Sequence, residues 1–331
     1  MLVLGVETSC DETSAGVVKD GREILSNVIL SQEIHEKYGG VVPELASRIH
    51  ITELVDIIDM ALGRAGVRLD DLDGLAVTYG PGLVGCLLVG ISFVKSVHQS
   101  TGIPFYGANH LEGHIFSNLL EQSEIKTPHI TLVASGGHSN LYFVEEWGKY
   151  KLLGSTRDDA PGEAFDKISN LLGLGYPGGP AIEKESIGGN RDFINFPRAM
   201  KDRDNYEFSF SGLKTAVALY LKDKPPDFIN DHLADIAASF QEAVCEILVI
   251  KTLNAAEAYD ISQVSITGGV ARNLRLRGLF EERKPANLEI FIPGPDLCSD
   301  NGAMVAACGS FHLQKGERSN LSLNAVPYLE L

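Results

Sequence analysis

The chain has 331 residues, of which 44% are hydrophobic and 22% charged, so it is long enough to bury two cores of ordinary domain size. Its formal net charge of −16 argues against broad nonspecific adhesion to nucleic acid, because such adhesion needs Lys and Arg to neutralise phosphates. The five cysteines are widely spaced and form no CxxC pair, which argues against a disulfide framework or a zinc ribbon and fits a reducing compartment.

The sequence carries no sign of export or membrane insertion. No basic region precedes an apolar run at the N-terminus, and the longest apolar stretch, at 84–94, is well short of the roughly 20 residues that cross a bilayer. We therefore expect a cytoplasmic protein that does not associate with a membrane.

The first half of the chain alternates apolar strands with amphipathic helices. A polar turn at 7–14 separates two short apolar runs and predicts a hairpin whose tip is rich in reactive side chains. In chain order we predict strands at 2–6 and 15–18, a helix at 43–65, a strand at 74–78, a GPG turn at 80–82, a helix at 83–98, a strand at 104–106 and a helix from about residue 110.

The pattern restarts near residues 126–128, which indicates a duplicated architecture joined by a hinge. Next we predict strands at 130–134 and 140–144, a loop-rich portion at 154–209, a helix at 233–259, a strand at 264–266 and a final helix beyond a glycine pair. This organisation predicts two related α/β domains: an N-terminal domain at 1–125, completed by about 300–331, and a second domain at 126–299 with 154–209 inserted.

Three tips at strand ends carry small residues and free backbone amides, which can approach phosphates closely. They lie at 7–14, 134–139 and 266–273. Taken singly, such a tip is more often plain hairpin chemistry. Their order is similar to the two phosphate loops and the adenosine loop of the actin/hexokinase/Hsp70-like (ASKHA) class, so we expect two mixed-sheet domains with a nucleotide and metal cleft between them.

Phosphotransferases of that class usually carry aspartate in the first loop and again before the glycines of the second. This chain has Glu7 at the first position and Ala134 or Ser135 at the second. Without the second carboxylate, orienting a water or hydroxyl toward a terminal phosphoryl group is difficult. The sequence therefore favours nucleotide binding without ordinary kinase chemistry.

Two histidines, His110 and His114, stand four residues apart and share one face of a predicted helix. Most HxxxH pairs are structural, but this pair follows a strand, at the sheet edge where open α/β folds bind ligands. Asp300, before a Gly- and Ala-rich helix, could add an oxygen ligand from across the cleft or could simply cap that helix. Two imidazoles and one carboxylate suit iron, with zinc as the alternative.

A metalloprotease of the HxxxH type is the rival interpretation. In HExxH enzymes the general-base glutamate directly follows the first histidine, and in inverted motifs it stands beside the second. Glu112 occupies neither position, and its side chain is expected to point away from the shared histidine face. This position disfavours peptide hydrolysis.

Ten blocks of sequence, which include the three tips and the histidine pair, are spread over nearly the whole chain. Through them the chain resembles the bacterial TsaD (Gcp) proteins of the Kae/TsaD/Qri family. The blocks are ETSCDETSAGVV from Glu7, GGVVPELASRIH from Gly39, TYGPGLVGCLLVG from Thr78, NHLEGH from Asn109, ASGGHS from Ala134, GEAFDK from Gly162, GYPGGP from Gly175, FSFSGLKTA from Phe208, TGGVARN from Thr267 and CSDNGAMVA from Cys298.

The resemblance implies transfer of a threonylcarbamoyl group from threonylcarbamoyl-AMP to N6 of the adenosine that follows the anticodon in tRNAs reading codons that begin with A. It implies that His110, His114 and Asp300 bind Fe²⁺ or Zn²⁺. It also implies an adenine-nucleotide ligand (threonylcarbamoyl-AMP, ATP or ADP) and, as partners, tRNA, a TsaB-like paralogue and a TsaE-like ATPase. The implied substrate contacts are Val133, Ala134, Ser135, Gly136, Gly137, Asp166, Gly179 and Asn273.

The carboxylates of the first tip are the best candidates for accepting the proton from N6. Asp11 and Glu12 have an equally good explanation as polar turn residues. Lys167, Lys214 and the basic run at 272–283 could form a local patch for tRNA, although a solvated helix face explains the run as well. A noncatalytic nucleotide-binding subunit is the third class of function that the sequence allows.

Overall fold

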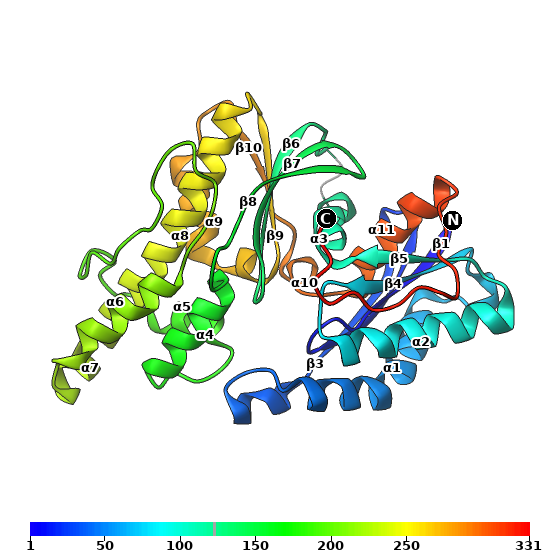
Figure 1. Cartoon of the computed structure of the whole chain (residues 1–331), viewed down its shortest axis with the longest axis horizontal. Helices are drawn as coiled ribbons and strands as arrows, with labels where there is room; N and C mark the ends of the chain where they lie inside the picture. The colour runs from blue at the N-terminus through cyan, green and yellow to red at the C-terminus, as the bar shows by residue number, and fades with distance from the viewer. Residues whose placement is uncertain (122–123) are drawn as a thin grey trace. The chain divides into compact units, whose positions relative to one another are not determined.

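The structure is a computed structural model that describes residues 1–121 and 124–331 (Figure 1). The chain forms two compact units. Unit 1 comprises residues 1–125 and 293–331, and unit 2 comprises residues 126–292. Because the last 39 residues return to unit 1, elements from both ends of the chain build the same core.

Unit 1 is built on a five-stranded mixed sheet in the order β3-β2-β1-β4-β5. The first three strands are antiparallel neighbours, whereas β1, β4 and β5 run parallel. The elements are β1 (Leu2–Glu7), β2 (Glu12–Lys19), β3 (Glu23–Ser31), α1 (Pro43–Ala65), β4 (Gly74–Gly80), α2 (Val84–Thr101), β5 (Phe105–Asn109), α3 (His110–Glu121), α10 (Pro295–Cys298) and α11 (Gly302–Gln314), with short 3-10 turns at Glu33–Tyr38 and Leu69–Asp71.

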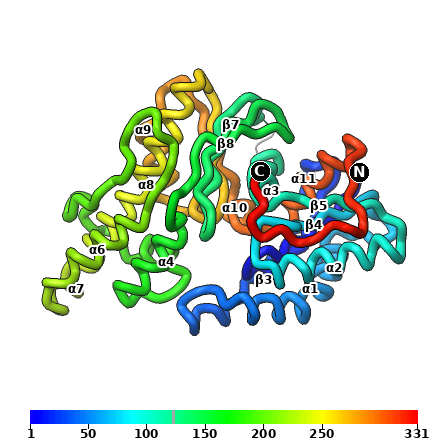
Figure 2. Tube along the Cα trace, in the orientation of Figure 1, coloured from blue at the N-terminus to red at the C-terminus, as the bar shows by residue number. Residues whose placement is uncertain are grey.

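The two faces of this sheet bury different helices, as the alternation of side chains along a strand requires. Leu4 and Val6 of β1 belong to a core that also includes Leu54 and Ile58 of α1 and Leu87 of α2. The other face of the sheet packs on α11, and glycines in the sheet and in the helix let the two backbones approach closely. A Cβ added to Gly5 would lie 2.1 Å from the carbonyl oxygen of Gly302. Figure 2 shows the chain path, with the C-terminal segment in red.

Unit 2 repeats this plan with a sheet in the order β10-β9-β6-β7-β8. Strands β6, β7 and β8 are antiparallel neighbours, and β6, β9 and β10 run parallel. The elements are β6 (His129–Ala134), β7 (Ser139–Glu146), β8 (Lys149–Ser155), α4 (Pro161–Leu171), α5 (Gly178–Glu185), α6 (Ser211–Lys222), α7 (Pro226–Asp231), α8 (Leu233–Ala258), β9 (Gln263–Thr267), a 3-10 turn (Gly269–Arg272), α9 (Leu274–Arg283) and β10 (Glu289–Phe291). The predicted fold class of two related mixed-sheet domains is confirmed.

The first hairpin of each sheet ends in one of the predicted tips. Glu7 pairs with Ser14 at the end of the β1–β2 ladder, and Ala134 pairs with Ser139 at the end of the β6–β7 ladder. The tip after β9 leads through Gly268 into α9. In unit 2 the tips after β6 and β9 therefore lie at the same edge of the sheet, because these strands are parallel neighbours.

Several elements differ from the sequence prediction. The second strand begins at Glu12 and not at residue 15, because the polar side chains of the tip continue the ladder with β3. The portion at 154–209 is less loop-rich than predicted, since it contains α4 and α5. The helix α4 begins with a proline at its first position, a start signal that its glycine-rich surroundings obscure.

His129, at the start of β6, should make unit 2 less stable in acid. Burial lowers the pKa of His129 to about 4, although its hydrogen bond to the Lys126 carbonyl acts in the opposite direction. The unfolded chain takes up this proton near the ordinary value of about 6.5, so stability is lost as the pH falls from there toward 4. We expect the contribution of His129 to make the free energy of unfolding about 2 kcal/mol lower at pH 5 than at pH 7.

The only tryptophan, Trp147, lies with its ring centroid 5.4 Å from that of His129 and reports the change. Urea unfolding at both pH values can be followed by the fluorescence of Trp147. The difference in the free energy of unfolding between pH 7 and pH 5 should be smaller for His129→Gln than for the parent chain. An equal difference in the two proteins would show that other groups cause the acid sensitivity.

Among the helices that the structure describes, none has both the length and the apolar content required to cross a bilayer.

Candidate functional site

The first part of the site is the start of α3 in unit 1. Asn109 ends β5, and its side-chain oxygen accepts hydrogen bonds from the backbone N–H of Leu111 at 2.8 Å and of Glu112 at 3.4 Å. Its amide nitrogen donates to the carbonyl of Glu330 at 3.1 Å. Asn109 therefore caps the helix and is itself held by the C-terminal segment. This cap fixes His110 as the first helical residue at the carboxyl edge of the sheet.

Asp300 follows α10 and directly precedes the cap of α11. The side chain of Asn301, not that of Asp300, accepts the hydrogen bond from the backbone N–H of Met304 at 2.9 Å. The capping alternative for Asp300 is therefore wrong. Asp300 also belongs to unit 1, as both histidines do, so the expectation that it reaches them from across the cleft is wrong as well.

These three side chains converge on one point. Oδ1 of Asp300 lies 3.1 Å from Nε2 of His114 and 3.5 Å from Nε2 of His110. Both imidazoles are buried, and one potential ligand atom from each of the three residues lies within 4.8 Å of the others. Two imidazoles and a carboxylate with open positions suit a first-row divalent cation such as iron or zinc. The donor set thus fits the metal that the sequence predicts.

A cation would replace a proton at this position. Burial by itself lowers the pKa of His110, but the charges of Asp300 and Glu7 outweigh burial and raise the pKa to about 9. The imidazole must lose that proton before it can ligate a cation, so binding should weaken in acid.

Glu7 orients His110, a role that the sequence did not reveal. The fully buried carboxylate accepts hydrogen bonds from the backbone N–H of Ser9 and the hydroxyl of Thr78, each at 2.6 Å. Its Oε2 also lies 3.2 Å from Nδ1 of His110. A carboxylate that holds one ring nitrogen turns the other toward a metal and increases its basicity. The glutamate at the aspartate position of the first loop thus has a defined task.

Replacing this carboxylate with its amide should weaken the metal site. In Glu7→Gln we expect the affinity for Zn²⁺ or Fe²⁺ to fall by about 10- to 100-fold, since an amide holds the imidazole less firmly. Competition with a chromophoric chelator measures the affinity. Glu44→Gln, the same change at an exposed residue of α1, is the control. Equal affinities in the two variants would contradict the orienting role.

Asp11 and Glu12 lie at the β1–β2 tip and are partly buried. Burial raises the pKa of Glu12 well above its usual range, and the negative charges of Asp11 and Asp300 raise it further. The charges of Glu7, Asp11 and Asp300 thus create a negative potential around Glu12, which favours a cation.

In unit 2 the predicted phosphate loop is tied to its neighbours by backbone hydrogen bonds. The N–H of Gly162 donates to the carbonyl of Ser135 at 3.2 Å, and the N–H of Glu163 donates to the carbonyl of Gly136 at 3.2 Å. A Cβ on Gly162 would lie 2.7 Å from Gly136, and one on Gly268 would lie 2.3 Å from the carbonyl of Ala134. The structure therefore brings the loop at 133–137, the start of α4 and the turn after β9 together.

The other predicted substrate contacts surround the same loops. Asp166 of α4 accepts a hydrogen bond from the N–H of Gly178 at 2.7 Å, which positions the half-buried Gly179. Asn273 caps α9 by accepting from the N–H of Leu276 at 3.0 Å, and its amide donates to Gln241 at 2.7 Å. The Asn273 side chain thus already has both its acceptor and a donor engaged within the protein.

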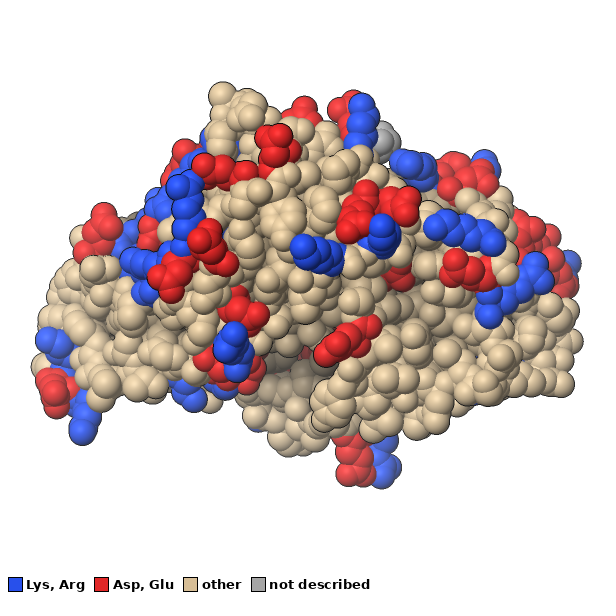
Figure 3. Space-filling view, turned by 45° about the horizontal axis from the view of Figure 1, so that its top comes forward, with Lys and Arg blue, Asp and Glu red and all other residues tan. Residues whose placement is uncertain are grey.

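The basic run at 272–283 is not a free patch. Arg275 is largely buried and pairs with Glu242 and Glu282, and Arg283 pairs with Glu246. Lys167, which we expected to join the patch, pairs with Asp159 and Glu163. Figure 3 shows Lys and Arg interspersed with Asp and Glu on the face it presents. Three of the expected cations are therefore paired with acidic neighbours, whereas Lys214 and Arg272 are exposed, and the tRNA surface stays a prediction.

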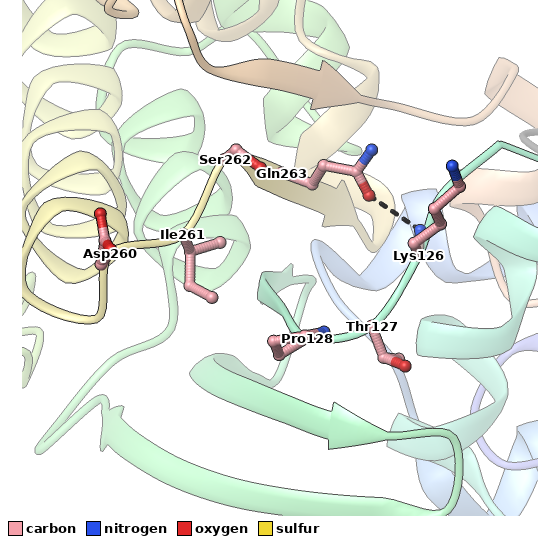
Figure 4. Close-up of a pocket in the computed structure, with 7 residues that line it drawn as sticks. All are labelled: Lys126, Thr127, Pro128, Asp260, Ile261, Ser262 and Gln263. Atoms are coloured by element: carbon pink, nitrogen blue, oxygen red, sulfur yellow. Dashed lines mark hydrogen bonds between the residues drawn. The ribbon is translucent and has the colours of Figure 1, made fainter.

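A surface hollow in unit 2 lies at the edge opposite the loops. It is lined by residues just before β6 and β9, and Gln263 accepts a hydrogen bond there from the N–H of Lys126 at 2.8 Å (Figure 4). Ligands of open α/β sheets bind at the carboxyl ends of the strands, so we do not assign this hollow to the site.

Comparison with known proteins gives a consistent result. A protein called tRNA N6-adenosine threonylcarbamoyltransferase in Caldicellulosiruptor bescii is 51% identical over 333 aligned residues, covering 100% of this chain and 98% of the relative. A protein with that name in Syntrophus aciditrophicus is 52% identical over 98% of this chain and 96% of its own.

Solved structures show the fold alone. HypF of T. kodakarensis matches with a TM-score of 0.65 at 15% identity, over 95% of this chain and 48% of HypF. Component A of the (R)-2-hydroxyglutaryl-CoA dehydratase of Acidaminococcus fermentans matches with a TM-score of 0.57 at 15% identity, over 95% and 99%. The model of the family "TsaD: tRNA N6-adenosine threonylcarbamoyltransferase" matches residues 23–307, and the chain belongs to this family.

Proposed function

We propose that this protein transfers the threonylcarbamoyl group of threonylcarbamoyl-AMP to N6 of the adenosine that follows the anticodon in tRNAs reading A-starting codons. The observation that carries the proposal is the convergence of His110, His114 and Asp300 in a chain that belongs to the TsaD family. The protease alternative finds no support. Glu112 contacts His312 and Cys308 and so turns away from the histidine pair.

The loops of unit 2 are the proposed binding site for the adenylate. Exposed backbone at Gly136 and Gly137, with Val133, Ala134 and Ser135 beside it, suits a phosphate that approaches the main chain closely. Asp166 would accept a hydrogen bond from a ribose or threonyl hydroxyl. Because its side chain caps α9, Asn273 would help seat the adenine or phosphate by fixing the start of that helix. Gly179 would act through its backbone. ATP or ADP would occupy the same loops.

The donor is a mixed anhydride, so its carbonyl is already activated. In the transfer, N6 attacks that carbonyl, the new N–C bond forms, the bond to the phosphate oxygen breaks and AMP leaves. A cation on His110, His114 and Asp300 would supply Lewis-acid stabilisation of the donor's oxygens, and we favour iron over zinc for this ligand set. Asp11 or Glu12 would accept the proton that N6 loses. Burial raises the pKa of Glu12, so its ionised form is a stronger base than that of an ordinary glutamate.

The proposed partners are a TsaB-like paralogue and a TsaE-like ATPase, in the cytoplasm. Two helices of unit 1 support a protein partner, because they expose apolar side chains at helical spacing. They are Ile51 and Val55 of α1 and Val84 and Leu88 of α2. These helices pack against each other, so the exposed residues can form one apolar surface.

The test is incubation of the metal-loaded chain with threonylcarbamoyl-AMP and unmodified tRNA, with and without the partner proteins. Digestion and mass analysis of the nucleosides then score the modified adenosine. Appearance of N6-threonylcarbamoyladenosine that depends on this chain is the expected result. No product with all partners present would sink the transfer proposal, and chelator-sensitive cleavage of a peptide would favour the protease.

A further inference from the structure

Unit 1 contains a second cluster of metal-ligating side chains, on another side of α3 from the histidine pair. Glu112 of α3 meets two residues of α11. Its Oε1 lies 3.0 Å from Nε2 of His312, and its Oε2 lies 3.4 Å from Sγ of Cys308. All three residues are buried, and Cys308 is completely so. A carboxylate, a thiol and an imidazole thus share an interior position.

The spacing of these atoms matches that of a cation site. One potential ligand atom from each of the three residues lies within 4.8 Å of the others. Bonds of about 2.0 Å to nitrogen or oxygen and about 2.3 Å to sulfur would separate neighbouring tetrahedral ligands by about 3.3–3.5 Å. The contacts at 3.0 and 3.4 Å are close to that range.

The surroundings of His312 are those of a metal ligand. Nδ1 lies 2.7 Å from Oε2 of Glu317, so an N–H at Nδ1 would leave the lone pair of Nε2, which lies 3.0 Å from Oε1 of Glu112, available to a cation. The ring of Tyr106 stacks on the imidazole, with centroids 4.3 Å apart and planes at 10°. The Glu317 side chain is 51% exposed and gives the buried position a polar route to the surface. A carboxylate that holds the far nitrogen of a ligating histidine is a common arrangement in zinc sites.

We propose that Glu112, Cys308 and His312 form a second site for a thiophilic divalent cation of the zinc class, distinct from the site at His110, His114 and Asp300. Three protein ligands leave one tetrahedral position for a small ligand such as water. The cation would join α3 to α11, the helix that follows Asp300. Its role is therefore structural: it would hold α3, which supplies His110 and His114, to the helix that begins two residues after Asp300.

Cobalt(II) tests this directly, because a cobalt–thiolate bond gives a charge-transfer band in the near ultraviolet that His and carboxylate ligands do not give. The metal-free, full-length His110→Ala/His114→Ala protein removes the first site without touching the second. Titration with CoCl2 should produce the band and saturate at one equivalent. Adding Cys308→Ala should abolish both the band and the binding of one equivalent of cobalt. Cys86 is another buried cysteine of unit 1, and adding Cys86→Ala should leave the band and the binding unchanged.

Zn²⁺ provides an independent readout. It should raise the melting temperature of the double variant by several degrees and should not change that of the triple variant with Cys308→Ala. No thiolate band together with no thermal shift in the double variant would overturn the proposal and leave the cluster as a hydrogen-bonded contact between helices. Neither measurement involves tRNA transfer, so the outcome is independent of the proposed function.

Discussion

His110→Ala should lose the cation of the first site and with it nearly all transfer activity. The variant keeps His114 and Asp300, whose contact at 3.1 Å does not involve His110, but two protein ligands bind a divalent cation far more weakly than three. Loss of an orienting partner of a ligand already costs about 10- to 100-fold, so loss of the ligand itself should cost roughly 100-fold or more in affinity and in turnover. Metal content by mass spectrometry and the nucleoside assay measure the two effects.

His98→Ala is the matched control, because it truncates a histidine of α2 whose hydrogen bond is to the Ile103 carbonyl and which belongs to neither cluster. It should keep the metal and the activity. Circular dichroism should give similar spectra for both variants. Full transfer activity in metal-stripped His110→Ala protein would refute the metal site as part of the reaction.

Gly302→Ala should destabilise unit 1 and displace Asp300. The first residue of α11 packs on the backbone of β2, where a Cβ would lie 2.3 Å from the nitrogen of Gly16 and 2.5 Å from the carbonyl carbon of Ala15. Backbone atoms of a central sheet cannot yield as a side chain would, so the helix must shift. We expect a loss of about 3 kcal/mol in the free energy of unfolding, at the upper end of overpacking costs. Because Gly302 follows Asp300 by two residues, metal affinity should fall as well.

Thermal or urea unfolding measures the first effect, and a chelator competition measures the second. The control is Gly63→Ala in α1, since a Cβ there meets no atom within 4 Å and the residue lies inside a helix. That change should leave stability unchanged or raise it by about 0.5–1 kcal/mol. Equal stability of the two variants would mean that α11 can move away from the sheet without cost.

Local signals in the sequence determined much of the fold. The helix predicted at 43–65 is α1, residue for residue, because its apolar period is long and proline and glycine mark its ends. The duplicated strand-tip-strand pattern gave the two mixed sheets. Three strands were missed. β10 at Glu289–Phe291 is too short to show a period, and β3 at Glu23–Ser31 and β8 at Lys149–Ser155 lack a regular apolar alternation.

For the site, the sequence by itself identified residue types whose chemistry is local: two histidines four residues apart on one helix, and glycines after strands. The tertiary structure decided which distant groups complete them. Glu7 meets His110 across 103 residues, and Asp300 meets His114 across 186. It also decided that Arg275 and Lys167 are paired and that Asn301 performs the capping that Asp300 could have performed. Such contacts depend on sheet order and on the packing of α11, which hydrophobic period and residue spacing do not encode.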